Sequence, residues 1–123
     1  MTTPTESGFF RVQQEQDLAT LLVLRPRITD EDNVDQFGQF LLDLIDTTGA
    51  RRMLMDATNV EFVTSSVLGK LITVHRTLQR EGGRLVLCSC SPALMDILET
   101  TRLTSLFEIA EDAAAGRAML ESA

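Results

Sequence analysis

The chain has 123 residues, 44% of them hydrophobic and 24% charged, and this length and composition suit one compact domain that folds unaided. Its formal net charge of −7 opposes a nucleic-acid-binding surface, whose affinity comes largely from clustered Lys and Arg. No apolar stretch approaches the roughly 20 residues that span a bilayer, and the polar start does not resemble a signal peptide, so we expect a soluble, cytoplasmic single domain over residues 1–123, with residues 1–7 as a flexible tail.

The predicted fold begins with a hairpin. Residues 9–13 and 18–24 have the hydrophobic pattern of strands, and the turn-prone residues 15–17 separate them. Adjacent strand residues face opposite ways. Phe9 and Phe10 therefore form either an exposed, adhesive edge or a pair divided between the core and a partner contact, and a homodimer through this hairpin stays open.

A helix follows the hairpin. Pro26 closes the second strand, and residues 29–32 are expected to supply both a cap and negative charge for the helix, which Gly49 ends. Its apolar face is expected to consist of Val34, Phe37, Leu41, Leu44 and Ile45. Negative charge at a helix N-terminus is stabilised by the helix dipole, so we interpret the acidic residues here as structural.

The central segment predicts a strand, helix, strand unit. Residues 53–56 lack polar alternation, which is typical of a parallel strand buried on both faces. A helix is expected over residues 67–80, and Gly82 and Gly83 form its C-cap before a strand at residues 84–88. One stripe of this helix is expected to carry Leu68, Leu71, Ile72, His75 and Leu78.

The last third of the chain continues the alternation. Pro92 is expected to start a short helix, a brief strand follows at residues 106–109, and a helix closes the chain at residues 113–120. The pattern predicts an α/β fold with a mixed, mostly parallel sheet of about four to five strands and about four helices.

Catalytic and metal-binding patterns lack their components. His75 is the only imidazole, and on an amphipathic helix we interpret it as a packing residue. Ser65 has no evident general base, and no glycine-rich phosphate loop precedes a helix. Cys88 and Cys90 are expected on opposite faces of one strand as free, buried or half-buried thiols. We therefore expect no enzyme activity, no metal and no cofactor.

Three hydroxyl residues, Thr64, Ser65 and Ser66, stand where the second helix is expected to start. The first amides of a helix lack intrahelical partners and carry partial positive charge, and Ser or Thr oxygens accept hydrogen bonds from them. A hydroxyl there is either a cap or a phosphoacceptor, whose modification adds about −1.5 to −2 charges at neutral pH. Both interpretations stay open on this ground alone.

Nearly the whole chain resembles the STAS family, the sulfate transporter and anti-sigma factor antagonist domain. The family pattern is an apolar strand ending in Asp, a short loop, an aromatic or apolar pair, Asp-Ser-Ser-Gly-Leu-Gly at a helix start, and Gly-Gly-x-Leu-x-Leu. The same order and spacing occur here at residues 53–56, 60–63, 64–69 and 82–87.

The resemblance implies a switch module of a bacterial partner-switching system that regulates transcription. In that scheme the unmodified domain binds an anti-sigma factor that is also a Ser kinase, phosphorylation of the residue matching Ser65 breaks the complex, and a Ser phosphatase restores it. We expect the partner-binding residues to be Thr29, Asp30, Thr64, Ser65, Ser66, Val67 and Lys70.

Three positions depart from the family pattern. Thr64 replaces the usual Asp, although Thr also caps helices. Val67 replaces Gly and is expected to crowd the partner surface beside Ser65. The family often has Gly-x-Leu-Asp after the second strand, whereas this chain has an acid only at Asp30, which either substitutes for that Asp or does not.

Two functions therefore stay open. One is an anti-sigma factor antagonist controlled by phosphorylation, and the other is a STAS scaffold or regulatory subunit of a sensory or transport complex that is never phosphorylated. Lys70, at i+5 from Ser65, is either a solvated side chain or part of the same surface.

Overall fold

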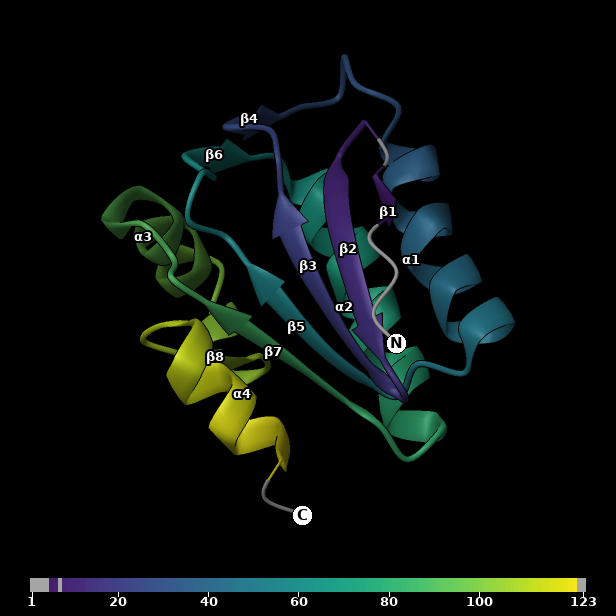
Figure 1. Cartoon of the computed structure of the whole chain (residues 1–123). Helices are drawn as coiled ribbons and strands as arrows, with labels where there is room; N and C mark the ends of the chain where they lie inside the picture. Colours follow the sequence, from purple (N-terminus) through teal and green to yellow (C-terminus); the bar gives the residue numbers. More distant parts are fainter. Residues whose placement is uncertain (1–4, 7, 122–123) are drawn as a thin grey trace.

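The computed structural model of the chain describes residues 5, 6 and 8–121 (Figure 1). The strands are β1 (Thr5–Glu6), β2 (Phe10–Glu15), β3 (Leu18–Val23), β4 (Arg27–Ile28), β5 (Arg52–Asp56), β6 (Phe62–Val63), β7 (Arg84–Cys88) and β8 (Glu108–Ala110). The helices are α1 (Val34–Thr48), α2 (Ser65–Arg80), α3 (Pro92–Thr100) and α4 (Ala113–Glu121), with one 3₁₀ turn at Leu103–Ser105.

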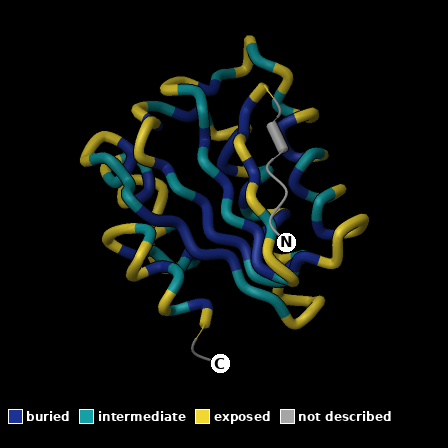
Figure 2. The backbone as a smooth tube through the Cα atoms, in the orientation of Figure 1, coloured by how far each residue is buried: buried dark blue, intermediate teal, exposed yellow. Residues whose placement is uncertain are grey.

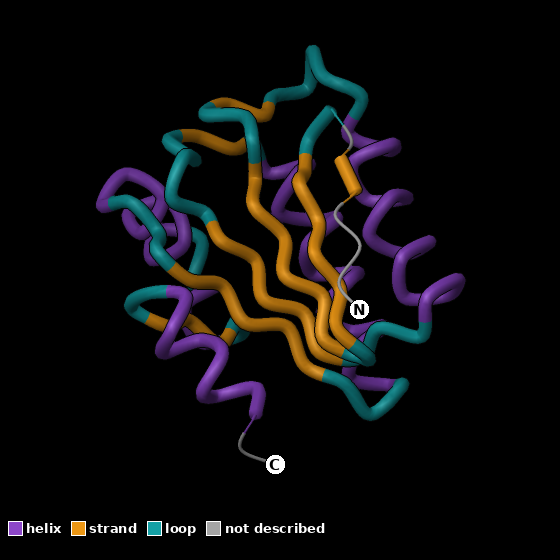
Figure 3. The backbone as a smooth tube through the Cα atoms, in the orientation of Figure 1, coloured by secondary structure: helices purple, strands orange, loops and turns teal. Residues whose placement is uncertain are grey.

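The main sheet has the strand order β1-β2-β3-β5-β7-β8. The strands β1, β2 and β3 pair antiparallel, whereas β3, β5, β7 and β8 pair parallel. Figure 3 shows the strands side by side in the sheet, and the arrows in Figure 1 give their directions. Strands β4 and β6 form a separate parallel pair. The predicted α/β class with a mixed, mostly parallel sheet and four helices is confirmed, and the two-residue β1 adds an edge strand to the expected count.

The leading hairpin is confirmed as β2 and β3, joined through Gln16 in a left-handed conformation with φ of 55°. Most of the expected flexible tail, residues 1–4 and 7, lies outside the described residues, while Thr5 and Glu6 pair with β2. Phe9 and Phe10 are both buried, so the alternatives of an exposed edge and of a partner contact are wrong.

An aromatic cluster explains why both phenylalanines turn inward. The Phe9 ring meets Phe37 of α1 edge to face at 5.4 Å, and the Phe10 ring stacks on Phe40 at 5.5 Å. Phe9 precedes β2 and is therefore free of the strand's strict alternation. This cluster fixes α1 against the hairpin.

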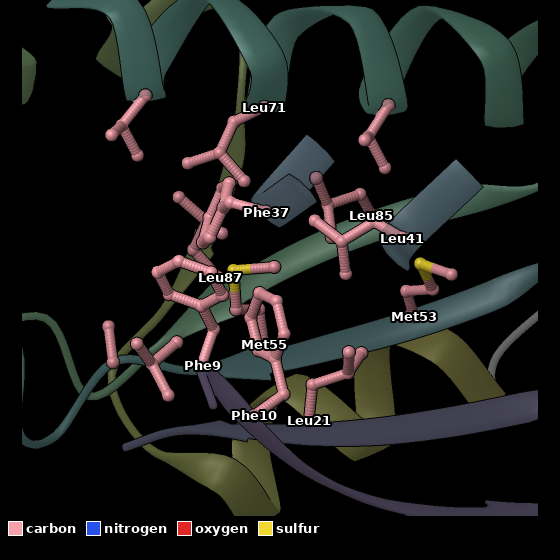
Figure 4. Close-up of a cluster of buried hydrophobic side chains, with 14 of the residues drawn as sticks. Phe9, Phe10, Leu21, Phe37, Leu41, Met53, Met55, Leu71, Leu85 and Leu87 are labelled. Carbon is pink, nitrogen blue, oxygen red and sulfur yellow. The ribbon is translucent and has the colours of Figure 1, made fainter. Parts of the chain in front are cut away.

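The core has two parts because residues of a buried parallel strand alternate between its faces. Met53 and Met55 of β5 point toward α1 and α2, into the larger cluster shown in Figure 4. Leu54 points to the other face, into a smaller cluster under α4. The prediction that the strand at residues 53–56 is buried is confirmed for Met53, Leu54 and Met55, whereas Asp56 is half-buried, and Figure 2 shows buried positions running along the central strands.

The start of α1 differs from expectation. Its cap is Asn33, whose side-chain oxygen accepts a hydrogen bond from the Gln36 amide at 3.0 Å, so the prediction of a cap within residues 29–32 is wrong. The Asp32 carboxylate is engaged earlier, by Arg25 at 2.6 Å and by the Thr29 amide at 2.8 Å. The segment therefore folds on itself before the helix begins.

Glycines end both long helices, as predicted. Gly49 is left-handed with φ of 74° after α1. After α2 the C-cap itself is Glu81, and Gly82 follows with φ of 80°. The Gly83 amide then donates to the Leu78 carbonyl at 2.6 Å, which closes the last turn.

The predicted strand at residues 106–109 is shifted, since β8 is Glu108–Ala110. The Phe107 amide donates to the Leu103 carbonyl at 2.9 Å, an α-type bond that closes the turn after the 3₁₀ residues, and Phe107 lies outside the sheet. The Phe107 ring is buried against His75, at 5.6 Å in an edge-to-face arrangement. His75 is itself buried, which confirms its interpretation as a packing residue.

Both cysteines are free, with Cys88 buried and Cys90 half-buried. Only Cys88 lies on β7, because Ser89 adopts a left-handed conformation with φ of 57° that ends the strand before Cys90. The expectation that both lie on opposite faces of one strand is wrong, since residues two apart on a strand share a face and Cys90 lies outside β7. Burial is the main cause that raises the pKa of each thiol to about 11.

Candidate functional site

The small sheet formed by β4 and β6 sets the position of the start of α2. Ile28 pairs with Val63, both side chains are buried, and the Thr64 amide donates to the Ile28 carbonyl at 3.2 Å. Residue 65 then begins the helix. The loop that follows β4 therefore runs beside the first turn of α2, at the edge of the molecule where Figure 1 draws β4 and β6.

Thr64 occupies the N-cap position of α2, with an extended backbone, but its side chain makes no capping hydrogen bond. Its Oγ1 lies 3.0 Å from Oδ1 of Asp30 instead. An ionised carboxylate only accepts hydrogen bonds, so the Thr64 hydroxyl donates to Asp30. The expectation that the Thr64 hydroxyl caps the helix is wrong, and the structure joins two of the predicted site residues in its place.

Ser65 and Ser66 are both exposed in the first turn of α2. Within the part of the chain that the structure describes, neither hydroxyl makes a side-chain hydrogen bond. The hydroxyl of Ser65 is therefore accessible to a second protein.

Val67 is fully buried and packs in the larger core cluster with Leu68 and Leu71. Successive residues of an α-helix turn by about 100°, so a residue two positions after an exposed Ser65 points nearly to the opposite side. The expectation that Val67 crowds the partner surface is therefore not met, and its side chain lies away from that surface.

Lys70 is bound to α1. Its Nζ lies 2.8 Å from Oδ1 of Asp35, and this interaction lowers the pKa of the Asp35 carboxyl. The Lys70 methylenes pack where a side chain on Gly38 would stand, since a Cβ there would come within 2.8 Å of Lys70 Cδ. The glycine lets α1 approach α2, and Lys70 bridges the two helices beside the site.

Two open hollows flank the loop after β4, which carries Asp30 and Asp32. One, of about 600 Å³, lies between the starts of α1 and α2 and includes Ser66 and Lys70 in its lining. The other, of about 530 Å³, is lined in part by Thr29 and Thr64, and Asp30 borders both hollows. The structure thus gathers Thr29, Asp30, Thr64, Ser66 and Lys70 around the exposed start of α2, with only Val67 turned away.

The site also contains residues that sequence reasoning missed. Arg25 binds Asp32 at 2.6 Å and lies over the Phe9 ring, 4.5 Å from its centroid. Arg27 lies over the Phe62 ring at 4.7 Å. The contact of Arg27 with Phe62 depends on the pairing of β4 with β6, for which two-residue strands give no periodic signal, and the Arg25 contacts join segments outside both strands.

Among residues 5, 6 and 8–121, no group of three or more His, Cys, Asp or Glu side chains is arranged to hold a metal ion. No helix in this part of the chain is long and apolar enough to cross a membrane. The site presents exposed hydroxyls beside the Asp30 carboxylate.

Comparison with known proteins matches residues 10–115 to the STAS domain. BtrV of Bordetella bronchiseptica, named as a candidate anti-sigma factor antagonist, is 26% identical over 96 residues, which cover 78% of this chain and 82% of BtrV. A candidate anti-sigma factor antagonist from Thermotoga maritima has a crystal structure with a TM-score of 0.81 and 18% identity, covering 92% of this chain and 95% of that one.

The phosphorylated form of SpoIIAA, a Bacillus cell fate determinant, has a TM-score of 0.67 and 17% identity, covering 89% of this chain and 98% of that one. At such identities the solved structures establish likeness of fold. The match to the family itself extends over most of the sequence and includes every element from β2 to the start of α4. The chain therefore belongs to the STAS domain family.

Proposed function

We propose that this chain is an anti-sigma factor antagonist whose unmodified form binds an anti-sigma factor that is also a Ser kinase, and which phosphorylation of Ser65 releases. The observation that carries the proposal is the exposed Ser65 at the first turn of α2, at the position that matches the family's phosphoacceptor. The solved structures of SpoIIAA, named as an anti-sigma factor antagonist, in unphosphorylated and phosphorylated forms support it by analogy.

The covalent step is a phosphoryl transfer. The Ser65 hydroxyl oxygen forms a bond to the γ-phosphorus of a nucleoside triphosphate, the bond between that phosphorus and the β,γ-bridging oxygen breaks, and the hydroxyl proton passes to a base of the kinase. Nucleotide and base belong to the partner in this scheme. The chain is therefore a substrate and binding module in the bacterial cytoplasm, and a Ser phosphatase returns it to the binding form.

Electrostatics around Ser65 favours release after phosphorylation. The phosphate adds about −1.5 to −2 charges. Two cationic side chains near the site are already paired, Arg25 with Asp32 and Lys70 with Asp35, while Arg27 lies over the Phe62 ring at the edge of the hollow that Thr64 lines. A new dianion beside the Asp30 carboxylate repels it and must also be desolvated when a partner covers the surface, so affinity falls.

The proposed contact surface consists of six exposed or half-exposed residues, four at the start of α2 and two in the loop after β4. They are Thr29, Asp30, Thr64, Ser65, Ser66 and Lys70. Val67 is omitted because its side chain is buried.

The test first uses the wild-type chain to recover its kinase from native lysate. The purified kinase is then titrated against the wild type and three variants. Ser65→Asp is expected to weaken binding by about tenfold or more, because the carboxylate imitates part of the phosphate charge. Ser65→Ala is expected to bind like the wild type and to accept no phosphate. Gln79→Glu, an exposed position about 21 Å along α2, is the control for added charge. Equal affinity of Ser65→Asp and wild type would contradict the proposal.

A scaffold or regulatory subunit of a sensory or transport complex is the second candidate. It is favoured by Thr64, which replaces the acid of the family pattern before the phosphoacceptor. This function predicts no phosphate on Ser65 in protein isolated from its native cells. Stoichiometric phospho-Ser65 in the mass spectrum would exclude it.

A further inference from the structure

Thr64 uses its hydroxyl differently from the cap residues of the other helices. The side chains of Asn33 and Ser91 each accept a hydrogen bond from an amide in the first turn of α1 and α3, at 3.0 and 3.1 Å. Thr64 stands at the same position before α2 but donates to Asp30. The start of α2 is therefore tied to the loop after β4 by a charge-assisted hydrogen bond.

Backbone pairing places Asp30 at this point. Ile28 pairs with Val63 in the small sheet, and the Thr64 amide donates to the Ile28 carbonyl. Asp30 follows two residues later and is carried alongside Thr64. Two buried side chains, Ile28 and Val63, thus hold the backbone that brings the exposed Asp30 side chain within reach of Thr64.

The neighbouring acids serve other contacts. Asp32 binds Arg25 and the Thr29 amide, and Asp35 binds Lys70. The Glu31 side chain is exposed, and its carboxylate makes no hydrogen bond or ion pair within the described residues. Among these four acids, Asp30 is the one that reaches the first turn of α2 in the described structure.

We propose that Asp30 is a positioning residue for Ser65, supplying from the loop after β4 the carboxylate that the family pattern carries in the residue before the phosphoacceptor. Through Thr64 it holds the first turn of α2, and its negative charge lies at the positive end of the helix dipole. The inference rests on the proposed function, because the position it fixes is that of the hydroxyl presented to the kinase.

The test uses an exchange of side chains. Asp30→Asn keeps the shape and removes the charge, Thr64→Val removes the donor, and Thr64→Asp places a second carboxylate against Asp30. The combined Asp30→Thr/Thr64→Asp variant restores one hydroxyl facing one carboxylate, now in the order of the family pattern. Glu31→Gln is the matched control, since it removes one charge from the same loop without touching Thr64.

The readouts are the initial rate at which the purified kinase phosphorylates Ser65 and its dissociation constant, with thermal unfolding measured on every variant. Each single change at Asp30 or Thr64 is expected to lower rate and affinity by about tenfold, the worth of one charge-assisted hydrogen bond. The exchanged variant is expected to recover to within about threefold of wild type, and Glu31→Gln to stay within about twofold.

Recovery in the exchanged variant distinguishes positioning from a merely structural role, because two independent destabilising changes do not cancel. The inference is overturned if Asp30→Asn behaves like Glu31→Gln, or if the exchanged variant is no better than the single changes. These outcomes, combined with weakened binding of Ser65→Asp, would leave the proposed function standing. Recovery of no kinase, or unchanged binding of Ser65→Asp, overturns both.

Discussion

His75 is the only histidine of the chain, and its side chain is 4% exposed. Neither ring nitrogen has a hydrogen-bond partner among the described residues, and the ring packs against Phe107. Burial is the main cause that lowers the pKa of the imidazole. Attraction to Glu108 opposes this shift and the nearby charge of Arg76 adds to it. We predict that the folded protein holds His75 neutral at pH 7 and loses stability on acidification.

The direction of this pH dependence follows from the number of protons that the folded and unfolded states bind. In the unfolded chain His75 takes up a proton near its ordinary pKa of about 6.5, whereas the folded protein takes it up only at lower pH. The unfolded state therefore binds more protons in this window. The contribution of a neutral His75 to stability is present above pH 6.5 and is lost, at up to about 1.4 kcal/mol per pH unit, as the pH falls toward the folded pKa.

The perturbation is His75→Leu, which replaces the imidazole by an apolar group of similar size. A buried polar group without a hydrogen bond destabilises a fold by about 1–3 kcal/mol, so its removal should stabilise this fold by a similar amount. With an unfolding entropy of roughly 2.1 cal/mol/K per residue over 123 residues, the melting temperature at pH 7 should rise by roughly 4–12 °C.

The assay is urea unfolding of both proteins between pH 7 and pH 5, followed by circular dichroism. Because the chain has one histidine, the difference between the two proteins isolates His75 from the carboxylates. The stability gap should widen as the pH falls below 6.5. A difference in unfolding free energy that does not change with pH, or a variant that is less stable than the wild type at pH 7, would contradict this prediction.

Three further predictions concern stability and reactivity. Gly83→Ala should destabilise the fold by about 1–3 kcal/mol, because the added Cβ would overlap the Arg51 carbonyl. Gly69→Ala has open space around the added Cβ and should stabilise α2 by up to about 1 kcal/mol. Denaturant titrations measure both changes. Arg84→Ala should speed hydrogen exchange in α4 by about tenfold, because Arg84 donates a hydrogen bond to the Met119 carbonyl in the last turn of that helix. Unchanged exchange would show that this hydrogen bond does not hold α4. The two thiols, with pKa values of about 11, should be alkylated at pH 8 about a hundredfold more slowly than in unfolded protein, and equal rates would contradict their burial.

Local pattern was sufficient for most of the fold. The apolar run at residues 53–55 and the helical stripe after residue 67 are set by burial, and burial imposes a period on the sequence. The cap at Asn33 was missed because Asp32, an equally good cap residue, is bound to Arg25. That contact joins different elements, and periodicity carries no information about it.

The details of the site lay beyond the sequence for a similar reason. A motif singled out Ser65, but the hydrogen bond between Thr64 and Asp30, 34 positions apart, depends on the register of two strands that have only two residues each. The bridge from Lys70 to Asp35 depends on how closely Gly38 lets α1 approach α2. Tertiary packing decided these contacts, and it also turned Val67 inward.

The central claim is that a phosphate on Ser65 controls partner binding. It is tested most directly by measuring the dissociation constant of the purified kinase for the chain phosphorylated stoichiometrically at Ser65, beside that of the unmodified chain. We expect the phosphorylated chain to bind the kinase about tenfold or more weakly. The phosphate adds a dianion to a surface that the kinase covers, one residue after Thr64, which is bonded to the Asp30 carboxylate. Equal dissociation constants for the two forms would contradict it.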